Sequence, residues 1–237
     1  MSDLAIALES AELRAAGFRH GFSTRRLSFK PLTPEALESI AIALRLDPAR
    51  IFIASQVHGA RAIFADGSPE AMQSVEADAI VACGAGDAVA VRIADCVPVL
   101  LADSETGAVA AVHAGWKGFV AGVVERAIAL GAERGARFDI AAIGPCIEAC
   151  CFEVGTEVAA QLAQAAGDDG IVTRAHSEKA FVDLRRGVRL KLARAGIRRI
   201  DDVAGCTRCD HERFFSYRRD REASGRHLAV IASRTLP

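Results

Sequence analysis

The centre of the chain holds four short apolar runs, and these constrain the fold more than any other feature of the sequence. Turn residues (Gly, Asp or Pro) bound the runs, which cover 78–82, 88–93, 97–103 and 108–114. Apolar runs of this length between turn residues are typical of buried strands. The sequence therefore predicts a protein whose core is built on β-sheet.

Helices and more strands are predicted on either side of this centre. Thr33 and Pro34 suit the N-cap and first turn of a helix over 34–46, and further helices are expected at about 119–134, 155–166 and 181–195. Further strands are expected at 18–23, 138–144, 200–205, 213–219 and 227–232, and as a tight pair at 51–57 and 60–64. Strands that come in runs, with helices after them, favour an α+β fold. We expect one domain over residues 1–237, a sandwich of mixed β-sheets flanked by helices.

Composition and charge exclude several classes of protein. The 29 basic and 30 acidic residues leave a net charge of −1, which gives no electrostatic footprint for nucleic acid. No stretch approaches the ~20 apolar residues of a membrane-spanning helix, and the N-terminus lacks the pattern of a signal peptide. Seven cysteines without an export signal argue against a disulfide framework. We therefore expect a cytoplasmic protein whose cysteines serve packing or chemistry.

Two histidines and a cysteine lie at the ends of predicted strands, where a rigid scaffold can hold side chains for chemistry. These are His58 in SQVHG (55–59), Cys96 in ADCVP (94–98) and His113 in HAGWKG (113–118). Two imidazoles and a thiolate are a good zinc set, and three protein ligands leave a fourth position for water or substrate. The alternative, from the residues alone, is a buried thiol and two hydrogen-bonded histidines.

A CxxC pair, Cys206 and Cys209, has the local spacing of a zinc knuckle or a redox pair. A zinc knuckle needs a second pair, and we do not expect Cys146, Cys150 and Cys151 to form one. The last two are adjacent, so they would point to opposite faces of a strand. The sequence therefore favours buried thiols here and one metal ion per chain.

Cationic residues near predicted element ends are candidates for anion binding. Lys117 precedes the helix expected from about Phe119, where free N–H groups and the helix dipole favour an anion, and Arg25 follows the first predicted strand. The alternative is a solvated basic loop. Arg218 and Arg219 are open to the same two interpretations.

Seven stretches spread along the chain carry the motifs of a known family. They are FSTR (22–25), SQVHG (55–59), ADAIV (77–81), ADCVPVLLAD (94–103), AVHAGWKG (111–118), IGPCIEACCFEVG (143–155), and CT followed by FFSYRRD and SGRHLAVIA (206–232). In these motifs and their order the chain resembles the YfiH-like family, also called the LACC-domain or multicopper polyphenol oxidoreductase (laccase) family. The resemblance implies that His58, Cys96 and His113 are zinc ligands. It also implies a sandwich of mixed sheets similar to that of cysteine hydrolases.

The resemblance further implies a purine nucleoside phosphorylase. Such an enzyme cleaves adenosine, inosine or guanosine with phosphate to the base and ribose 1-phosphate, also cleaves S-methyl-5′-thioadenosine, and deaminates adenosine. A copper-dependent polyphenol oxidase is the alternative that the family's older label suggests. Multicopper oxidation needs several copper centres and many more histidines than the 6 present, so we expect zinc.

Both reactions require further residues beside the metal. Zinc lowers the pKa of a bound water, so that hydroxide is available near neutral pH to attack adenine. A carboxylic acid must then carry protons to the leaving ammonia. Asp78 and Asp95 are the nearest candidates, with Glu148 as a third; capping a strand end or holding a ligand histidine is the competing role. For phosphorolysis, Arg25 and Lys117 would hold the phosphate.

Two other functions fit the same residues. One is a thiol hydrolase in which Cys96 is the nucleophile and His113 the base. The other is a zinc-binding module without catalytic activity.

Overall fold

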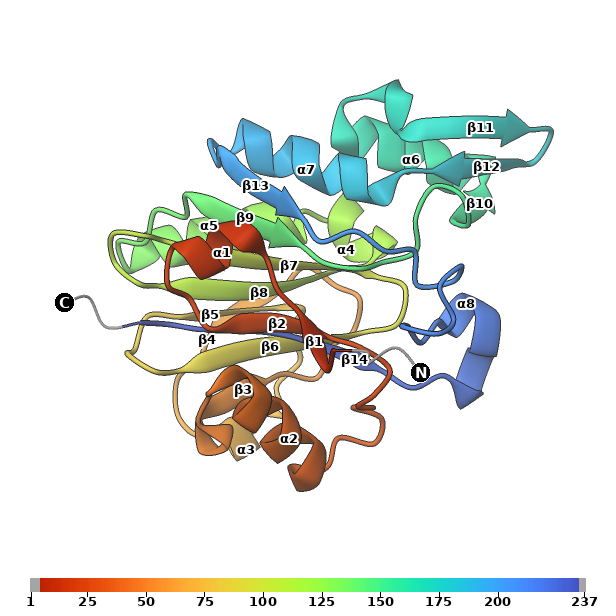
Figure 1. The fold of residues 1–237 in the computed structure, drawn as a ribbon. Coiled ribbons are helices and arrows are strands. Elements are labelled where there is room, and N and C mark those ends of the chain that lie inside the picture. Colours follow the sequence, from red (N-terminus) through yellow and green to blue (C-terminus); the bar gives the residue numbers. More distant parts are fainter. Residues whose placement is uncertain (1–4, 235–237) are drawn as a thin grey trace.

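Two large β-sheets packed face to face form the body of the protein (Figure 1), in a computed structural model that describes residues 5–234. The five-stranded sheet has the order β1 (Ala7–Leu8), β2 (His20–Ser23), β14 (His227–Ala232), β6 (Ala88–Ile93) and β3 (Ile51–Ile53). The six-stranded sheet has the order β13 (Arg199–Asp202), β9 (Ile140–Ile143), β7 (Val97–Ala102), β8 (Val109–Ala114), β5 (Ala79–Ala82) and β4 (Ala62–Phe64). Both sheets contain parallel and antiparallel pairs. The α+β sandwich of mixed sheets is thereby confirmed.

Three apolar clusters hold the layers together. The one between the sheets joins Phe22 and Phe52 of the first sheet to Ile80 and Leu100 of the second. Another packs α2 (Pro34–Leu44) on the outer face of the five-stranded sheet. The third packs α5 (Val123–Glu133), α6 (Thr156–Ala166) and α7 (Leu184–Arg194) on the outer face of the six-stranded sheet. Helices therefore cover both outer faces of the sandwich (Figure 1).

The remaining elements are small and lie around these layers. A three-stranded sheet has the order β10 (Glu153–Gly155), β12 (Lys179–Val182) and β11 (Val172–His176). The short helices are α1 (Ala11–Ala15), α3 (Pro69–Met72), α4 (Trp116–Val120) and α8 (Tyr217–Asp220), with 3-10 turns at Pro48–Arg50, Asp169–Ile171 and Arg221–Ala223. Among residues 5–234, no helix is both long and apolar enough to cross a membrane.

The start of α2 follows the prediction from sequence. Thr33 is its N-cap, with a side chain that accepts the N–H of Ala36, and Pro34 is its first residue. The left-handed Arg45 (φ 57°) ends the helix. The apolar positions Ile40 and Leu44 then face the sheet.

Three local predictions are wrong. The segments 51–57 and 60–64 do not pair with each other, because β3 pairs with β6 and β4 pairs with β5 in the other sheet. The helix expected at 119–134 is broken in two by Gly122 (φ 85°). The segment 213–219 is not a strand, because the Ser216 side chain accepts the N–H of Arg219 and starts α8.

Candidate active site and metal centre

One end of the six-stranded sheet brings together residues that are distant in the sequence. β8 lies between β5 and β7, and Pro98 near the start of β7 opposes His113 near the end of β8. The N–H of His113 also donates to the carbonyl of Asp78, just before β5, at 2.8 Å. Asp78 and Cys96 therefore flank His113 on its two sides.

The loop that carries His58 is held by the buried carboxylate of Asp78. Its oxygens accept the backbone N–H groups of Val57 at 3.3 Å, His58 at 2.9 Å and Gly59 at 2.7 Å. These bonds stabilise a left-handed backbone at His58 (φ 60°), which non-glycine residues rarely adopt. The same carboxylate lies 2.8 Å from Nδ1 of His113. Nδ1 thus has its partner, which leaves Nε2 of His113 as the ligand atom.

The side chains of His58, Cys96 and His113 form a cluster. Their ligand atoms lie within 4.8 Å of one another, and the two imidazole rings stand edge to face with centroids 4.8 Å apart. Gly115 lies beside them: a Cβ there would be 3.1 Å from Cδ2 of His58 and 3.2 Å from Sγ of Cys96. The donor set and its spacing fit one zinc ion, and the missing side chain at Gly115 leaves the cluster uncrowded.

Electrostatics favours the thiolate form of Cys96. Burial acts to raise the pKa of this thiol, but the charge of His113 and hydrogen bonds from His113 and His58 lower it to about 6. Burial acts to lower the pKa of His113, but the charge of Cys96 and hydrogen bonds to Asp78 and Cys96 raise it to about 9. Cys96 is therefore in the form that binds a metal or acts as a nucleophile.

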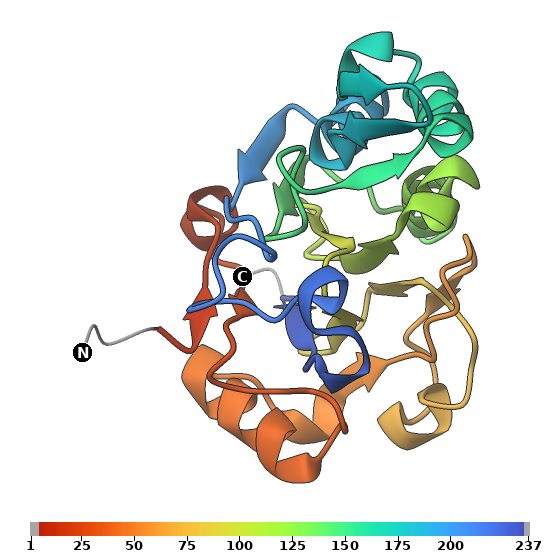
Figure 2. The same ribbon diagram turned by 90° about the vertical axis from the view of Figure 1, so that its right-hand side faces the viewer.

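A cavity of about 680 Å³ opens from this cluster toward α8. Its volume lies in the range of ~300–1,000 Å³ that is usual for small-molecule sites. Trp116, Ile147, Phe152 and Leu184 give it an apolar wall. Figure 2 looks onto this end of the sandwich, where the segment around α8 crosses in front.

Four cationic side chains also line the cavity: Lys30, Arg92, Arg218 and Arg226. Within residues 5–234, Nε of Arg92 is buried without a hydrogen-bond partner. Burial and the charge of Arg226 lower the pKa of Arg92. Two guanidinium groups close enough to repel each other at a cavity wall favour an anionic ligand.

Comparison with known proteins places the chain in a family. Residues 34–234 match the family model described as multi-copper polyphenol oxidoreductase laccase. The chain belongs to this laccase family. A purine nucleoside phosphorylase of Streptomyces coelicolor is 40% identical over 192 residues, which cover 78% of this chain and 76% of that protein. An adenosine deaminase from an unknown prokaryote is 35% identical over 212 residues, which cover 83% and 80%.

Solved structures share the laccase-family fold. A Bacillus licheniformis YfiH protein superposes with a TM-score of 0.86 at 24% identity, covering 99% of this chain and 98% of that one. A Neisseria meningitidis protein superposes with a TM-score of 0.79 at 30% identity, covering 93% and 96%. The layered sandwich described above is therefore the fold of solved structures as well.

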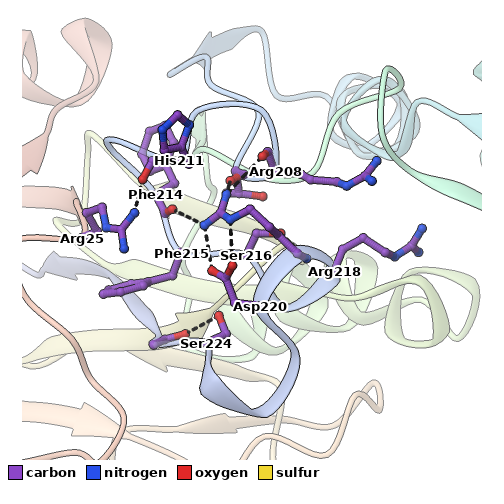
Figure 3. A network of polar contacts seen from close by, with 12 residues as sticks. Arg25, Arg208, His211, Phe214, Phe215, Ser216, Arg218, Asp220 and Ser224 are labelled. Atoms are coloured by element: carbon purple, nitrogen blue, oxygen red, sulfur yellow. Dashed lines mark hydrogen bonds and ion pairs between the residues drawn. The ribbon is translucent and has the colours of Figure 1, made fainter.

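The two phosphate ligands predicted from the sequence of this laccase-family protein, Arg25 and Lys117, do not line the cavity. Arg25 donates to the carbonyl of His211 and lies over the ring of Phe215, 5.3 Å from its centroid (Figure 3). Lys117 is exposed, with Nζ 5.7 Å from the centroid of the Trp116 ring. Lys117 lies in α4, which has only 5 residues, and not before a long helix whose dipole would strengthen an anion site.

The three candidate carboxylates occupy different places. Asp78 and Glu148 do not line the cavity. Asp95 does, but Oδ1 accepts the hydroxyl of Thr207 and Oδ2 the N–H of Arg218, both at 2.6 Å. The geometry favours a supporting role for Asp78 and leaves Asp95 as the one of the three that lines the cavity.

A second cysteine cluster in this laccase-family chain was not expected from the sequence. Its members are Cys150, Cys151, Cys206 and Cys209, whose sulfurs lie within 4.8 Å of one another. The expectation that Cys150 and Cys151 do not complete the CxxC is wrong, because they lie in a turn, where the N–H of Cys151 donates to the carbonyl of Glu148. Four cysteines can hold a metal ion, so the chain has a second candidate metal site.

The Cys206 thiol lies in a polar backbone environment. Burial acts to raise its pKa, but backbone hydrogen bonds from Glu148, Cys209 and Arg208 hold it below the usual value. Such bonds stabilise the Cys206 thiolate, the form that a metal requires. Burial raises the pKa of Cys150, and the hydrogen bond with Cys151 raises that of Cys209 to about 11, so a metal would displace protons from these two thiols.

Sequence reasoning also missed Arg92 and Arg226. Arg92 had a detectable signal, because a cation in the apolar strand AVAVRI (88–93) is unusual unless the strand reaches a functional cavity. Arg226 had none, since it lies in a loop rich in charge.

Proposed function

We propose that this laccase-family protein is a purine nucleoside phosphorylase that uses a zinc ion held by His58, Cys96 and His113. One observation carries the proposal: this cluster shares a cavity with Arg92 and Arg226. Phosphorolysis needs a group that favours departure of the purine and cations that hold phosphate. The names of two curated relatives, a purine nucleoside phosphorylase and an adenosine deaminase, support a nucleoside as substrate.

The arginine pair is the proposed phosphate site. Guanidinium groups bind phosphate oxygens in a bidentate manner, and the ligand would give the buried Nε of Arg92 a partner. Held in this way, a phosphate oxygen attacks C1′ of the ribose while the C–N bond to the purine breaks. The purine leaves with the bonding electrons and takes up a proton, which gives the free base and ribose 1-phosphate.

The apolar wall and the metal cluster serve the purine. Trp116 and Phe152 offer flat faces to the base and exclude water from it. When bound, zinc supplies Lewis acidity, which stabilises negative charge on a departing group and makes water reactive near neutral pH. For deamination of adenosine, we assign proton transfer to Asp95, since it lines the cavity and adjoins the zinc ligand Cys96; Glu222, which also lines the cavity, lies beside Tyr217 in the α8 segment.

A thiol hydrolase is the second candidate, and one observation favours it. Cys96, His113 and Asp78 are hydrogen-bonded in series, and a thiol with a pKa of about 6 is a competent nucleophile. Alkylation of the zinc-loaded protein separates the two proposals. A zinc-bound thiolate is protected, whereas a nucleophilic Cys96 reacts stoichiometrically.

The decisive experiment is a panel of purine nucleosides incubated with and without phosphate, with products separated by chromatography. We expect free base and ribose 1-phosphate only with phosphate, and inosine from adenosine in either case. Metal content of protein purified without added metal, and turnover of a phenol, test the copper alternative. Absence of turnover across the panel by zinc-loaded protein would overturn the proposal.

A further inference from the structure

We propose that Cys150, Cys151, Cys206 and Cys209 bind a second zinc ion, at a structural site separate from the active-site cluster. This inference does not depend on the proposed enzymatic activity, because no member of the four-cysteine site lines the cavity.

The distances between the sulfurs carry the proposal. Cys150 Sγ lies 3.7 Å from that of Cys151, 3.6 Å from that of Cys206 and 3.6 Å from that of Cys209. Cys151 Sγ lies 3.3 Å from that of Cys209. Around a tetrahedral zinc ion with Zn–S bonds of ~2.3 Å, two sulfurs are about 3.8 Å apart. These four distances are close to that value, and the other two are within 4.8 Å, so the four sulfurs can surround one ion.

The same distances argue against the other uses of four cysteines. In a [4Fe–4S] cluster each thiolate binds a different iron, and in a [2Fe–2S] cluster two thiolates bind each iron, so the sulfurs on different irons stand further apart than around one ion. In two disulfides, each sulfur would have one bonded partner at ~2.05 Å, whereas Cys150 has three nearly equidistant neighbours. A closed set of four thiolates without an open position is typical of structural zinc.

Two backbone segments are shaped to present these thiols. Cys146 and Cys206 form an isolated parallel bridge, in which the N–H of Thr207 donates to the carbonyl of Cys146 at 3.0 Å. On one side of the bridge, the turn closed by the carbonyl of Glu148 carries the adjacent cysteines. On the other side, the N–H of Asp210 donates to the carbonyl of Cys206 at 3.0 Å and curls the CxxC into a knuckle. The register of the bridge thus brings the two pairs face to face.

The zinc would fasten an irregular segment that leads into α8, where Tyr217 and Arg218 line the cavity. Residues 203–216 contain no helix or strand. Beyond them, Arg218 donates its N–H to Asp95 and its side chain to the carbonyl of Glu153, at 2.9 Å. A metal that joins the turn before Glu153 to the knuckle before Arg218 would therefore fix the distance between two walls of the cavity.

The guanidinium of Arg219 holds this segment on its other side. The guanidinium of Arg219 donates to the carbonyls of Thr207, Arg208 and Phe214. It also pairs with Asp220 at 2.8 Å (Figure 3). These contacts order residues within the segment. Its connection to the turn at Cys150 consists of the bridge at Cys146 and of the N–H of Gly205, which donates to the Glu148 carboxylate at 3.3 Å. The zinc ion would reinforce that connection.

The test is a count of zinc per full-length chain, purified under reducing conditions and supplied with zinc alone. We expect two equivalents for the wild type, one for Cys209→Ser and one for Cys96→Ala. Cys83→Ser is the matched control, because Cys83 is an exposed thiol outside both clusters, and it should keep two. Cobalt in Cys96→Ala should give the intense visible and sulfur-to-metal absorption of a tetrathiolate site.

A second measurement needs no variant. Mass mapping of alkylated wild-type protein should show the four cysteines protected when zinc is bound and reactive after chelation. One equivalent of zinc in the wild type, with Cys150 and Cys209 freely alkylated, would overturn the proposal. So would two equivalents in Cys209→Ser, or a mass four units lower, which would mark two disulfides. Because the count is made without substrate, its outcome is independent of the nucleoside panel.

Discussion

Nδ1 of His113 lies 2.8 Å from Oδ1 of Asp78, and both side chains are almost fully buried. The same carboxylate binds three backbone N–H groups around His58. One buried anion thus fixes two of the three proposed zinc ligands. We therefore regard Asp78 as a positioning residue.

Asp78→Asn should weaken zinc binding at the active site. The amide NH2 would replace an acceptor oxygen and face backbone N–H groups or the ring Nδ1–H, so the His58 loop or the His113 ring must shift. Loss of such a partner lowers metal affinity by roughly 10- to 100-fold. Competition with a chromophoric chelator measures the change.

Asp103→Asn is the matched control for Asp78→Asn. Asp103 is also buried and also binds backbone N–H groups, but it lies outside both cysteine-containing clusters. It should lower stability and leave zinc affinity unchanged. Equal loss of affinity in the two variants would mean that Asp78 acts only on folding.

Arg92→Met should impair phosphorolysis far more than deamination. It keeps the aliphatic stem and removes the charge, while the backbone of Arg92 stays paired with Gln56. Loss of a charge-assisted contact costs ~1.5–3 kcal/mol, so the KM for phosphate should rise by roughly 10- to 150-fold. Base release at varied phosphate and inosine formation without phosphate measure the two activities.

Lys117→Ala serves as the comparison, and we expect a small effect because Lys117 is exposed outside the cavity. If Lys117→Ala raises the KM for phosphate and Arg92→Met does not, the phosphate site lies at the start of α4 and our assignment fails.

The free energy of unfolding should fall as the pH is lowered, because His227 is buried in its neutral form. Nε2 of this buried residue accepts the N–H of Phe215 at 2.7 Å, and burial lowers its pKa to about 4. Because the unfolded state keeps the ordinary pKa of about 6.5, it binds the proton more readily than the folded state. The contribution of neutral His227 is therefore complete above about pH 6.5 and is lost as the pH falls through 4.

His227→Gln retains an acceptor and removes the titration. Denaturant unfolding at pH 7.5 and 5.5 should show a smaller loss in this variant than in the wild type, by on the order of 1 kcal/mol. Some pH dependence of stability should remain in the variant, because burial also lowers the pKa of His20. Identical losses in both proteins would contradict the assignment.

Removal of zinc should expose the irregular segment to trypsin. Arg208 is exposed between Cys206 and Cys209, and the metal would hold its backbone in the knuckle. Chelation should speed cleavage after Arg208 on the order of tenfold, since local opening controls proteolysis. Cleavage after Lys179 gives an internal reference. In Cys96→Ala the bond after Arg208 should stay protected until chelator is added. If this variant is cleaved rapidly without chelator, the protection comes from the active-site metal and not from the four-cysteine site.

The proximity of the three proposed zinc ligands follows from their positions at strand ends, and the family resemblance then favoured a metal there over hydrogen-bonded histidines. Once β5, β8 and β7 align, the register of the sheet places Asp78, His113 and Cys96 side by side. The loop of His58 then follows, because β4 runs parallel to β5 and starts at the same end. In such cases local patterns and sheet geometry lead to the same arrangement.

The four-cysteine cluster and the proposed phosphate residues could not be predicted in this way. The rule that adjacent residues point to opposite faces applies to strands, and Cys150 and Cys151 lie in a turn. The importance given to Lys117 assumed a long helix, which Gly122 interrupts. Arg226 comes from a loop that only the tertiary fold brings to Arg92. Turn geometry and long-range packing decide these positions, and neither leaves a periodic pattern in the sequence.

The middle strand of the five-stranded sheet is β14, which pairs with β2 on one side and β6 on the other. During synthesis on the ribosome, residues 20–23 and 88–93 therefore emerge long before the strand that joins them. Until residue 232 has left the exit tunnel, the edges of β2 and β6 that pair with β14 have no partner strand. The nascent chain should thus depend on chaperones more than a protein whose strands pair with near neighbours in the sequence. A premature stop before β14 should leave a fragment in which β2 and β6 each keep an unpaired edge and which therefore aggregates.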